Sequence, residues 1–212
     1  MKRLTASVES INQQVWKALQ TDPAIMRDSQ RRLINTRALA KYLIRKYDLK
    51  ASLDAVISSI RRFPLDGYQE EEKILQHIFQ DSVVSTKNNI ACVTIYMAPS
   101  QVFEKLRATS LPAIRITTGT EEVKILAENG YADSIAKLFK GAEVEHDLSE
   151  ISITTAEKAT KTKGVLARIA AELALANINI HEMCMCSPQF LIYVSQKDIV
   201  KAHERIITLT QS

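Results

Sequence analysis

The sequence contains few of the residues that mark several specialised classes of protein. Its three cysteines, Cys92, Cys184 and Cys186, are too few for a disulfide framework. With five glycines, the chain has no glycine-rich phosphate-binding loop. No apolar run reaches the roughly 18 residues that a membrane-spanning helix needs, and the initial Met-Lys-Arg is not followed by the apolar core of a signal peptide. We therefore expect a cytoplasmic protein with no membrane partner.

What the chain does contain is typical of a globular protein with an uneven charge. Hydrophobic residues make up 46% and charged residues 25% of its 212 residues, which is enough chain for two or three small domains. Residues 1–66 carry 13 Lys and Arg against 6 Asp and Glu, a net charge of +7. Residues 67–212 carry 15 against 18, a net charge of −3. The basic character therefore belongs to the N-terminal third.

The N-terminal third has the apolar spacing of helices throughout. A first helix should end at Asp22, because a residue before proline avoids the helical region. Asn35 is placed to cap a helix over 36–47, and Ser52 to cap another over 53–63. Two short helices joined by a tight turn are typical of a helix-turn-helix motif.

One interpretation of these helices is DNA binding, with cations on phosphates and the second helix in the major groove. The candidate DNA-binding residues are Arg37, Lys41, Ser52, Ser58, Ser59, Arg61 and Arg62. The alternative is a helical bundle that docks on the rest of the protein or forms a dimer, with a solvated basic face. The outward side of the second helix is short and rich in serine, which argues against strong direct readout of bases.

Residues 64–67 interrupt the helices, and a linking helix is expected over 68–80. Glu70, Glu71 and Glu72 lie in its first turn, where the helix dipole favours negative charge. This helix could pair with its copy in a dimer, pack on the domain that follows, or serve only as a connector.

The stretch from Ser149 to Ser195 changes its apolar period several times, which indicates alternating strands and helices. The predicted order is a strand at 151–153, a polar loop ending at Gly164, a helix over 165–176, a strand over 177–180, a Ser187-Pro188 turn, a strand over 190–194 and a helix over 197–209. This β-α-β-β-α order is a split βαβ unit of the ferredoxin-like type.

The preceding residues repeat this pattern loosely. Residues 87–95 match residues 145–153 at an offset of 58, with apolar residues coinciding at three positions. A helix over 100–107, strands over 113–118 and 122–128, and a helix over 131–139 then form a second β-α-β-β-α unit. The C-terminal unit lacks a fourth strand, whereas 82–87 is a spare strand. We therefore predict that the strand over 82–87 supplies the missing strand of the C-terminal unit. The other unit is then inserted, along the chain, between this strand and the rest of the C-terminal unit.

At these residues the sequence resembles a known family. Gly164-Val165-Leu166-Ala167-Arg168-Ile169, followed by Leu173-Ala174 and Asn177-Ile178-Asn179-Ile180, is similar to an ACT domain, a small-molecule sensing module of amino-acid metabolism. The interleaved pair resembles the regulatory end of aspartokinases without the kinase domain.

The resemblance implies an α+β protein in which an all-α, helix-turn-helix-like domain precedes two ferredoxin-like βαββαβ ACT units, the first inserted in the second. The implied division is a helical domain over 1–66, a linking helix over 67–81, an ACT unit formed by 82–88 and 147–212, and an inserted ACT unit over 89–146.

The resemblance also implies an amino-acid effector, bound where the first strand meets the first helix and against the start of the second strand. Backbone N–H groups at a helix N-terminus suit the α-carboxylate. The implied ligand-binding residues are Thr162, Gly164, Val165, Leu166, Asn177, Ile178 and Asn179; their counterparts in the inserted unit are Pro99, Ser100, Gln101, Val102, Ala113 and Ile114. Lys163 and Ser100 depart from the family pattern, and Ser100 makes the inserted site the weaker candidate. The alternative is that both units only dimerise.

The segment over 181–186, His-Glu-Met-Cys-Met-Cys, contains ligands suited to copper or zinc. Strand alternation argues against a metal site, because it places Cys184 and Cys186 on the face of Ile178 and Ile180, opposite Met183. No nucleophile motif or paired carboxylates indicate catalysis. We expect no enzyme, no metal and no cofactor.

Two functions remain. The first is a homodimeric transcription regulator that binds an amino acid through its ACT units and DNA through its helical domains. The second is an allosteric regulatory subunit, without DNA binding, of an amino-acid biosynthetic enzyme.

Overall fold

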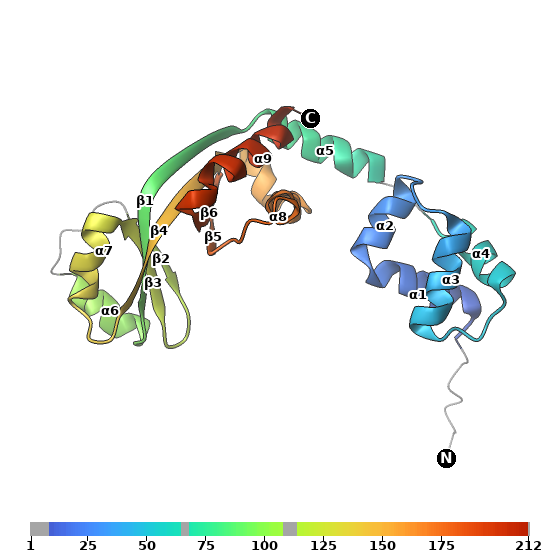
Figure 1. Cartoon of the computed structure of the whole chain (residues 1–212), viewed down its shortest axis with the longest axis horizontal. Coiled ribbons are helices and arrows are strands. Elements are labelled where there is room, and N and C mark those ends of the chain that lie inside the picture. The colour runs from blue at the N-terminus through green and yellow to red at the C-terminus, as the bar shows by residue number, and fades with distance from the viewer. Residues whose placement is uncertain (1–8, 65–67, 108–113, 212) are drawn as a thin grey trace, which may run out of the picture. The chain divides into compact units, whose positions relative to one another are not determined.

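The computed structural model describes residues 9–64, 68–107 and 114–211, and within it the chain forms two compact units, Met1–Lys73 and Ile74–Ser212 (Figure 1). The division falls inside helix α5 (Tyr68–Gln80). In the described residues, the regular structure of the first unit is helical, whereas the second unit combines helices with a six-stranded sheet.

The first unit, which we call the helical unit, contains four helices whose starts are set by side-chain caps. These are α1 (Ile11–Thr21), α2 (Pro23–Gln30), α3 (Thr36–Tyr47) and α4 (Leu53–Arg61). The Asn35 side chain accepts hydrogen bonds from two amides of α3, and Ser52 accepts one from Ala55, so both predicted caps are confirmed. Asp22 ends α1 and caps α2, as its place before proline requires.

Trp16 connects α1 to α4 in the core of the helical unit. Its indole N–H donates to the Ser59 carbonyl at 3.1 Å, and its ring lies edge-on to Phe63 with centroids 5.7 Å apart. Leu19, Leu43 and other buried apolar residues complete this core. The apolar spacing of the sequence therefore produces one packed cluster of four helices.

The second unit, which we call the sheet unit, is built on six antiparallel strands in the order β2-β3-β1-β4-β6-β5. The strands are β1 (Val83–Ile95), β2 (Arg115–Thr118), β3 (Val123–Glu128), β4 (Glu143–Thr154), β5 (Glu182–Cys186) and β6 (Gln189–Ser195). Between the strands lie α6 (Pro99–Leu106), α7 (Asn129–Ala136), the 3-10 helix η1 (Glu157–Lys161) and α8 (Val165–Leu175), and after β6 come the 3-10 helix η2 (Gln196–Asp198) and α9 (Ile199–Gln211).

Strands β1 and β4 are long and belong to both halves of the sheet (Figure 1). Val83 to Lys87 pair with the end of β4, next to β6, whereas Ile90 to Ile95 pair with β3. The register between β1 and β4 shifts after Lys87, and Asn89 and Asp147 have positive φ values of 65° and 58° at this point. A bulge of this kind bends a strand.

Helices cover opposite ends of the sheet. One core packs α8, α9 and the end of α5 against β4 and β6, and includes Ile78, Ile169 and Ile192. A second core packs α6 and α7 against β1 and β3, and includes Val102 and Ile125. Each half therefore has helices on one face (Figure 1).

The other face carries a cluster formed only by strand residues: Ile90, Cys92, Leu126, Leu148, Leu191 and Tyr193, with Cys184 packed against it. The two edge strands meet across this face, since Thr117 Oγ1 of β2 lies 3.6 Å from Cys184 Sγ of β5. Lys124 of β3 forms an ion pair with Glu182 of β5, and His181 Nδ1 lies 2.7 Å from Glu145 Oε1. The sheet therefore curls until its two ends are in contact.

Two predictions about the C-terminal strands are wrong. Residues 177–180 do not form a strand, because Asn177 and Ile178 donate their amides back to the end of α8, and β5 begins at Glu182. The irregular residues break the alternation assumed for this segment. Met183 consequently lies on the helix-covered face with Ile178 and Ile180, and Cys184 lies on the opposite face.

Candidate functional site

The first half of the predicted effector site lies at the N-terminus of α8. Gly164 is the N-cap, with a φ of 87°, and no side chain caps this end of the helix. Thr162 turns away from it, because its hydroxyl donates to the Lys158 carbonyl at 2.8 Å. Val165 is buried, whereas Leu166 is 40% exposed. The exposed features are therefore a helix N-terminus and a leucine side chain.

The second half lies at the opposite end of α8. Asn177 has a φ of 57°, and Ile178 is buried with its amide bonded to the Leu173 carbonyl at 3.0 Å. Asn179 is exposed. The eleven residues of α8 separate the two halves by about 16 Å at 1.5 Å per residue. One protomer therefore does not bring the predicted residues together around one small molecule.

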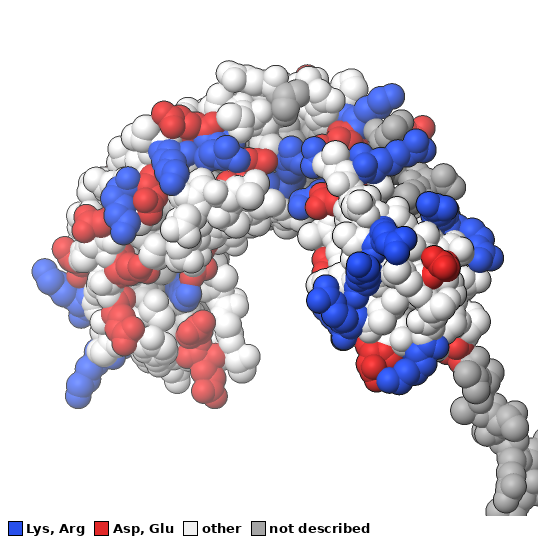
Figure 2. Space-filling view, turned by 45° about the vertical axis from the view of Figure 1, so that its right-hand side comes forward, with Lys and Arg blue, Asp and Glu red and all other residues white. Residues whose placement is uncertain are grey.

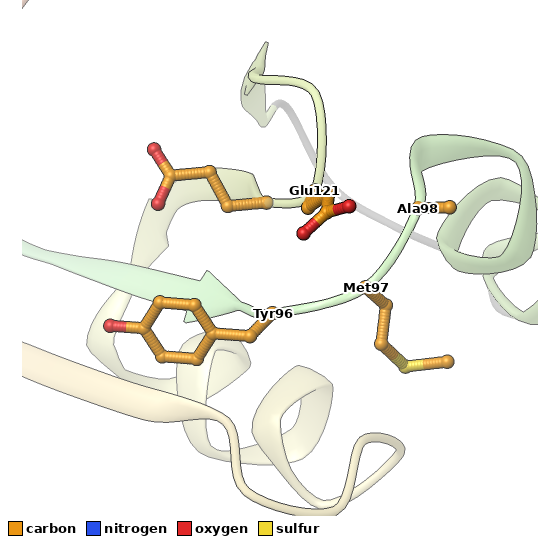
Figure 3. A pocket seen from close by; sticks show the side chains of 5 residues that line it. Tyr96, Met97, Ala98 and Glu121 are labelled. Carbon is orange, nitrogen blue, oxygen red and sulfur yellow. The ribbon is translucent and has the colours of Figure 1, made fainter.

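A shallow pocket of about 570 Å³ lies at the strand-to-helix junction of the other half of the sheet. Figure 3 shows Tyr96, Met97 and Ala98 along one side and Glu121 opposite them. The Tyr96 hydroxyl donates to Glu143 Oε2 at 3.0 Å, and this bond raises the pKa of Tyr96. The pocket is acidic and open on one side, which favours a cation over an anion.

None of the counterparts predicted there is among the residues that line this pocket. Ala98 lines it, but the predicted residues begin at Pro99, which starts α6. Val102 is buried in the core, Ser100 and Gln101 are exposed, and Ala113 lies outside the described residues. The lining residues Tyr96, Glu121 and Glu122 were missed by sequence analysis.

Six of the seven predicted DNA-binding residues are exposed. Ser59 is fully buried in the helical unit, so its prediction as an outward-facing residue is wrong. Its position on α4 faces α1, where the Trp16 indole reaches the Ser59 carbonyl. Ser52 is exposed but already caps α4.

Four of the predicted cations lie on α3 and at the end of α4, and all four are exposed. Arg37, Lys41, Arg61 and Arg62 form no ion pair with any residue in the described ranges. Arg45 extends the row of Arg37 and Lys41 along α3 at four-residue spacing, which marks one helix face, although Arg45 is not one of the predicted DNA-binding residues. Figure 2 shows more Lys and Arg than acidic side chains on the visible face of the helical unit.

The described residues contain no group of three or more His, Cys, Asp or Glu side chains arranged to hold a metal ion. Within the same ranges, no helix combines the length and apolarity needed to cross a membrane.

The antiparallel sheet and its flanking helices define an α+β fold that is consistent with ACT-like units. Sequence comparison finds no protein-family model and no curated protein that matches the chain. Comparison with solved structures, by contrast, finds the regulatory portions of aspartate kinases among the similar folds.

The regulatory subunit of aspartate kinase from Thermus thermophilus matches 59% of this chain and 95% of its own, with a TM-score of 0.52 and 16% identity. Aspartate kinase from Clostridium acetobutylicum matches 60% of this chain with a TM-score of 0.51 and 19% identity, and the match spans only about a third of that enzyme, 34%. A Vibrio cholerae protein of unknown function matches 66% of this chain and 99% of its own, at 18% identity and a TM-score of 0.51. The TM-scores indicate a shared fold, and at these low identities the likeness shows the fold alone.

Proposed function

We propose that the protein is a non-catalytic regulator that responds to an amino acid, with the sheet unit as sensor. The observation that carries this proposal is the shared fold with a free-standing regulatory subunit, which is matched over 95% of its length. The pairing of β1 with both β3 and β4 supports two interleaved ACT-like units, with 89–146 inserted between 82–88 and 147–212.

The effector site at α8 requires a second copy of the chain. The N-terminus of α8 offers backbone N–H groups to an α-carboxylate, and the amides of Asn177 and Asn179 offer oxygens to an ammonium group. Because these halves lie at opposite ends of α8, we infer a homodimer in which one protomer supplies the helix N-terminus and its partner supplies the asparagines.

The output that we propose is DNA binding by the helical unit. Helices α3 and α4 are joined by a short turn in which Asp48 is left-handed. Lys46 of α3 is paired with Asp22, whereas Arg37, Lys41, Arg61 and Arg62 form no ion pair with any described residue. Such cations neutralise phosphates and release counterions. An effector that changes the dimer would change the spacing of two helical units and hence their fit to two half-sites.

The alternative output is control of an enzyme by direct docking. The similar folds include the regulatory subunit of aspartate kinase from Thermus thermophilus, which favours an allosteric subunit as much as a transcription regulator. The outward side of α4 also offers few base-reading side chains, because Ser59 is buried and Ser52 is used as a cap.

Effector binding is tested by thermal unfolding of the purified chain with each of the twenty amino acids. A ligand at 100 times its Kd should add about 2.7 kcal/mol of stability, which corresponds to several degrees in Tm. The variant Asn177→Gly with Asn179→Ala keeps the left-handed backbone but removes both amides, and should lose this stabilisation. Asn12→Ala in α1 is the control and should retain it. If none of the twenty amino acids raises the Tm, the proposal that the sheet unit senses an amino acid is refuted.

DNA binding is tested by fluorescence anisotropy with unrelated duplex DNA over a range of salt concentrations. If each cation contacts one phosphate, changing Arg37, Lys41, Arg61 and Arg62 to alanine should reduce the slope of log K against log salt by about 0.9 per contact. The control changes Lys137, Lys140, Lys158 and Lys161, which lie in the sheet unit. Equal slopes for both variants, together with co-purification of a metabolic enzyme, would support the alternative.

A further inference from the structure

The curled sheet forms a partly open cavity of about 140 Å³ on its helix-free face, next to the strand-only cluster. Its lining includes residues from both ends of the sheet: Lys87, Arg115, Leu126, Glu128, Glu150 and Tyr193. The volume corresponds to about five water molecules at about 30 Å³ each. A small polar molecule therefore fits, whereas a bulky one does not.

Charges on the cavity wall are only partly compensated. Lys87 and Glu128 form an ion pair at 2.7 Å, and the Tyr193 hydroxyl donates to Glu150 Oε2 at 2.6 Å. Burial, together with this bond, raises the pKa of Tyr193, so the hydroxyl remains a donor. Arg115 bonds only to the Ile114 carbonyl at 3.4 Å and forms no ion pair with the residues that the structure describes.

The wall therefore presents an unpaired guanidinium, a carboxylate that accepts one hydrogen bond from protein, and an apolar lining that includes the buried Ile90 and Leu126. A guanidinium binds a carboxylate through two parallel hydrogen bonds. A carboxylate held by one tyrosine retains lone pairs for an ammonium group. These three features match the three parts of a small α-amino acid.

We propose that this cavity is a second effector site, which binds a small α-amino acid in its zwitterionic form within a single protomer. Arg115 receives the α-carboxylate, Glu150 receives the ammonium group, and a short side chain lies on the apolar wall. The site is separate from the ends of α8 and needs no partner subunit, although its purpose rests on the sensing function proposed above.

Occupancy of this cavity would connect the two ends of the sheet. Arg115 belongs to β2, whereas Glu150 and Tyr193 belong to β4 and β6 in the other half. Among the described residues, these ends are joined by the strand-only cluster, the Lys124–Glu182 ion pair, the contact of Thr117 with Cys184 and that of His181 with Glu145. A bound zwitterion would add ionic contacts to Arg115 on one side and Glu150 on the other. It would therefore stabilise the arrangement in which the two ends of the sheet are in contact.

The test is isothermal titration of the full chain with glycine, alanine, serine, threonine and aspartate. For the amino acid that binds, Arg115→Gln and Glu150→Gln should each weaken this binding at least tenfold. Glu150→Gln keeps an oxygen to accept the Tyr193 hydroxyl. Arg107→Gln, at an exposed arginine of the same half of the sheet, is the control and should bind as the unaltered chain does.

A second measurement does not depend on the variants folding. The amide of the same amino acid lacks the α-carboxylate and should bind the unaltered chain at least tenfold more weakly. Binding that survives Arg115→Gln, or equal binding of the amide, would overturn the cavity site. Amino-acid sensing would still stand if Asn177→Gly with Asn179→Ala abolished that binding. No binding of any of the five amino acids to the unaltered chain would overturn the cavity site, and no response to any of the twenty in the thermal screen would overturn both proposals.

Discussion

Replacing Gly164 with alanine perturbs the turn that positions the N-terminus of α8. Gly164 has a φ of 87°, a left-handed conformation that costs an L-residue about 1–2 kcal/mol. An added Cβ would lie 3.4 Å from Leu75 Cδ1, which is an ordinary contact, so the cost should come from the backbone alone. We expect Gly164→Ala to lower the free energy of unfolding by about 1–2 kcal/mol.

Two other glycines provide matched controls for this substitution. Gly141 has a φ of 80° and no atom within 4 Å of an added Cβ, so Gly141→Ala should cost the same as Gly164→Ala. Gly130 lies inside α7 and has equally open space around an added Cβ, so Gly130→Ala should raise stability by up to about 1 kcal/mol. The three variants therefore separate backbone strain from helix propensity.

Urea unfolding followed by far-UV circular dichroism measures these changes, and a thermal scan should show about 2–4 °C per kcal/mol. Trp16 is the single tryptophan and lies in the helical unit, so its fluorescence follows a region that these substitutions leave untouched. If Gly164→Ala unfolds at the same urea concentration as the unaltered chain, or if Gly130→Ala loses as much stability, the backbone reasoning is refuted.

Three further outcomes follow from the structure. Tyr193→Phe should lower stability by about 1.5–3 kcal/mol in urea unfolding, because it removes a partly buried hydrogen bond from a buried tyrosine to a carboxylate; an unchanged midpoint would contradict this. Burial raises the pKa of Cys92 to about 11, so alkylation at pH 8 should modify the exposed Cys186 first and Cys92 only after unfolding, as peptide mass spectrometry would show. Backbone hydrogen bonding, chiefly from Ile25, lowers the pKa of Asp22. The stability that ionised Asp22 gives the folded state should therefore be complete above the ordinary aspartate pKa and be lost as the pH falls through the lowered pKa. Asp22→Asn should make the free energy of unfolding fall less steeply at low pH. The same fall in the variant and the unaltered chain would contradict a stabilising role for ionised Asp22 at this cap.

Features determined by neighbours along the chain could be predicted from the sequence. The caps at Asn35 and Ser52 depend on side chains that reach amides two or three residues away. The helix predicted over 165–176 agrees with α8, because one apolar stripe follows a glycine. The strand predicted over 177–180 from the alternation of apolar residues is absent, because the amides of Asn177 and Ile178 donate to carbonyls at the end of α8.

Features that depend on residues distant in sequence were decided only by the tertiary structure. Ser59 is polar and outward by helical spacing, but α1 packs over it. The sequence predicted that the residues at the two ends of α8 form one effector site. In the structure the length of this helix separates them by about 16 Å. Arg115 and Glu150 share a cavity wall only because β1 and β4 bend and the sheet curls end to end. Local propensity sets where helices and strands form, whereas the curl that joins these two residues depends on bulges and packing across the whole sheet.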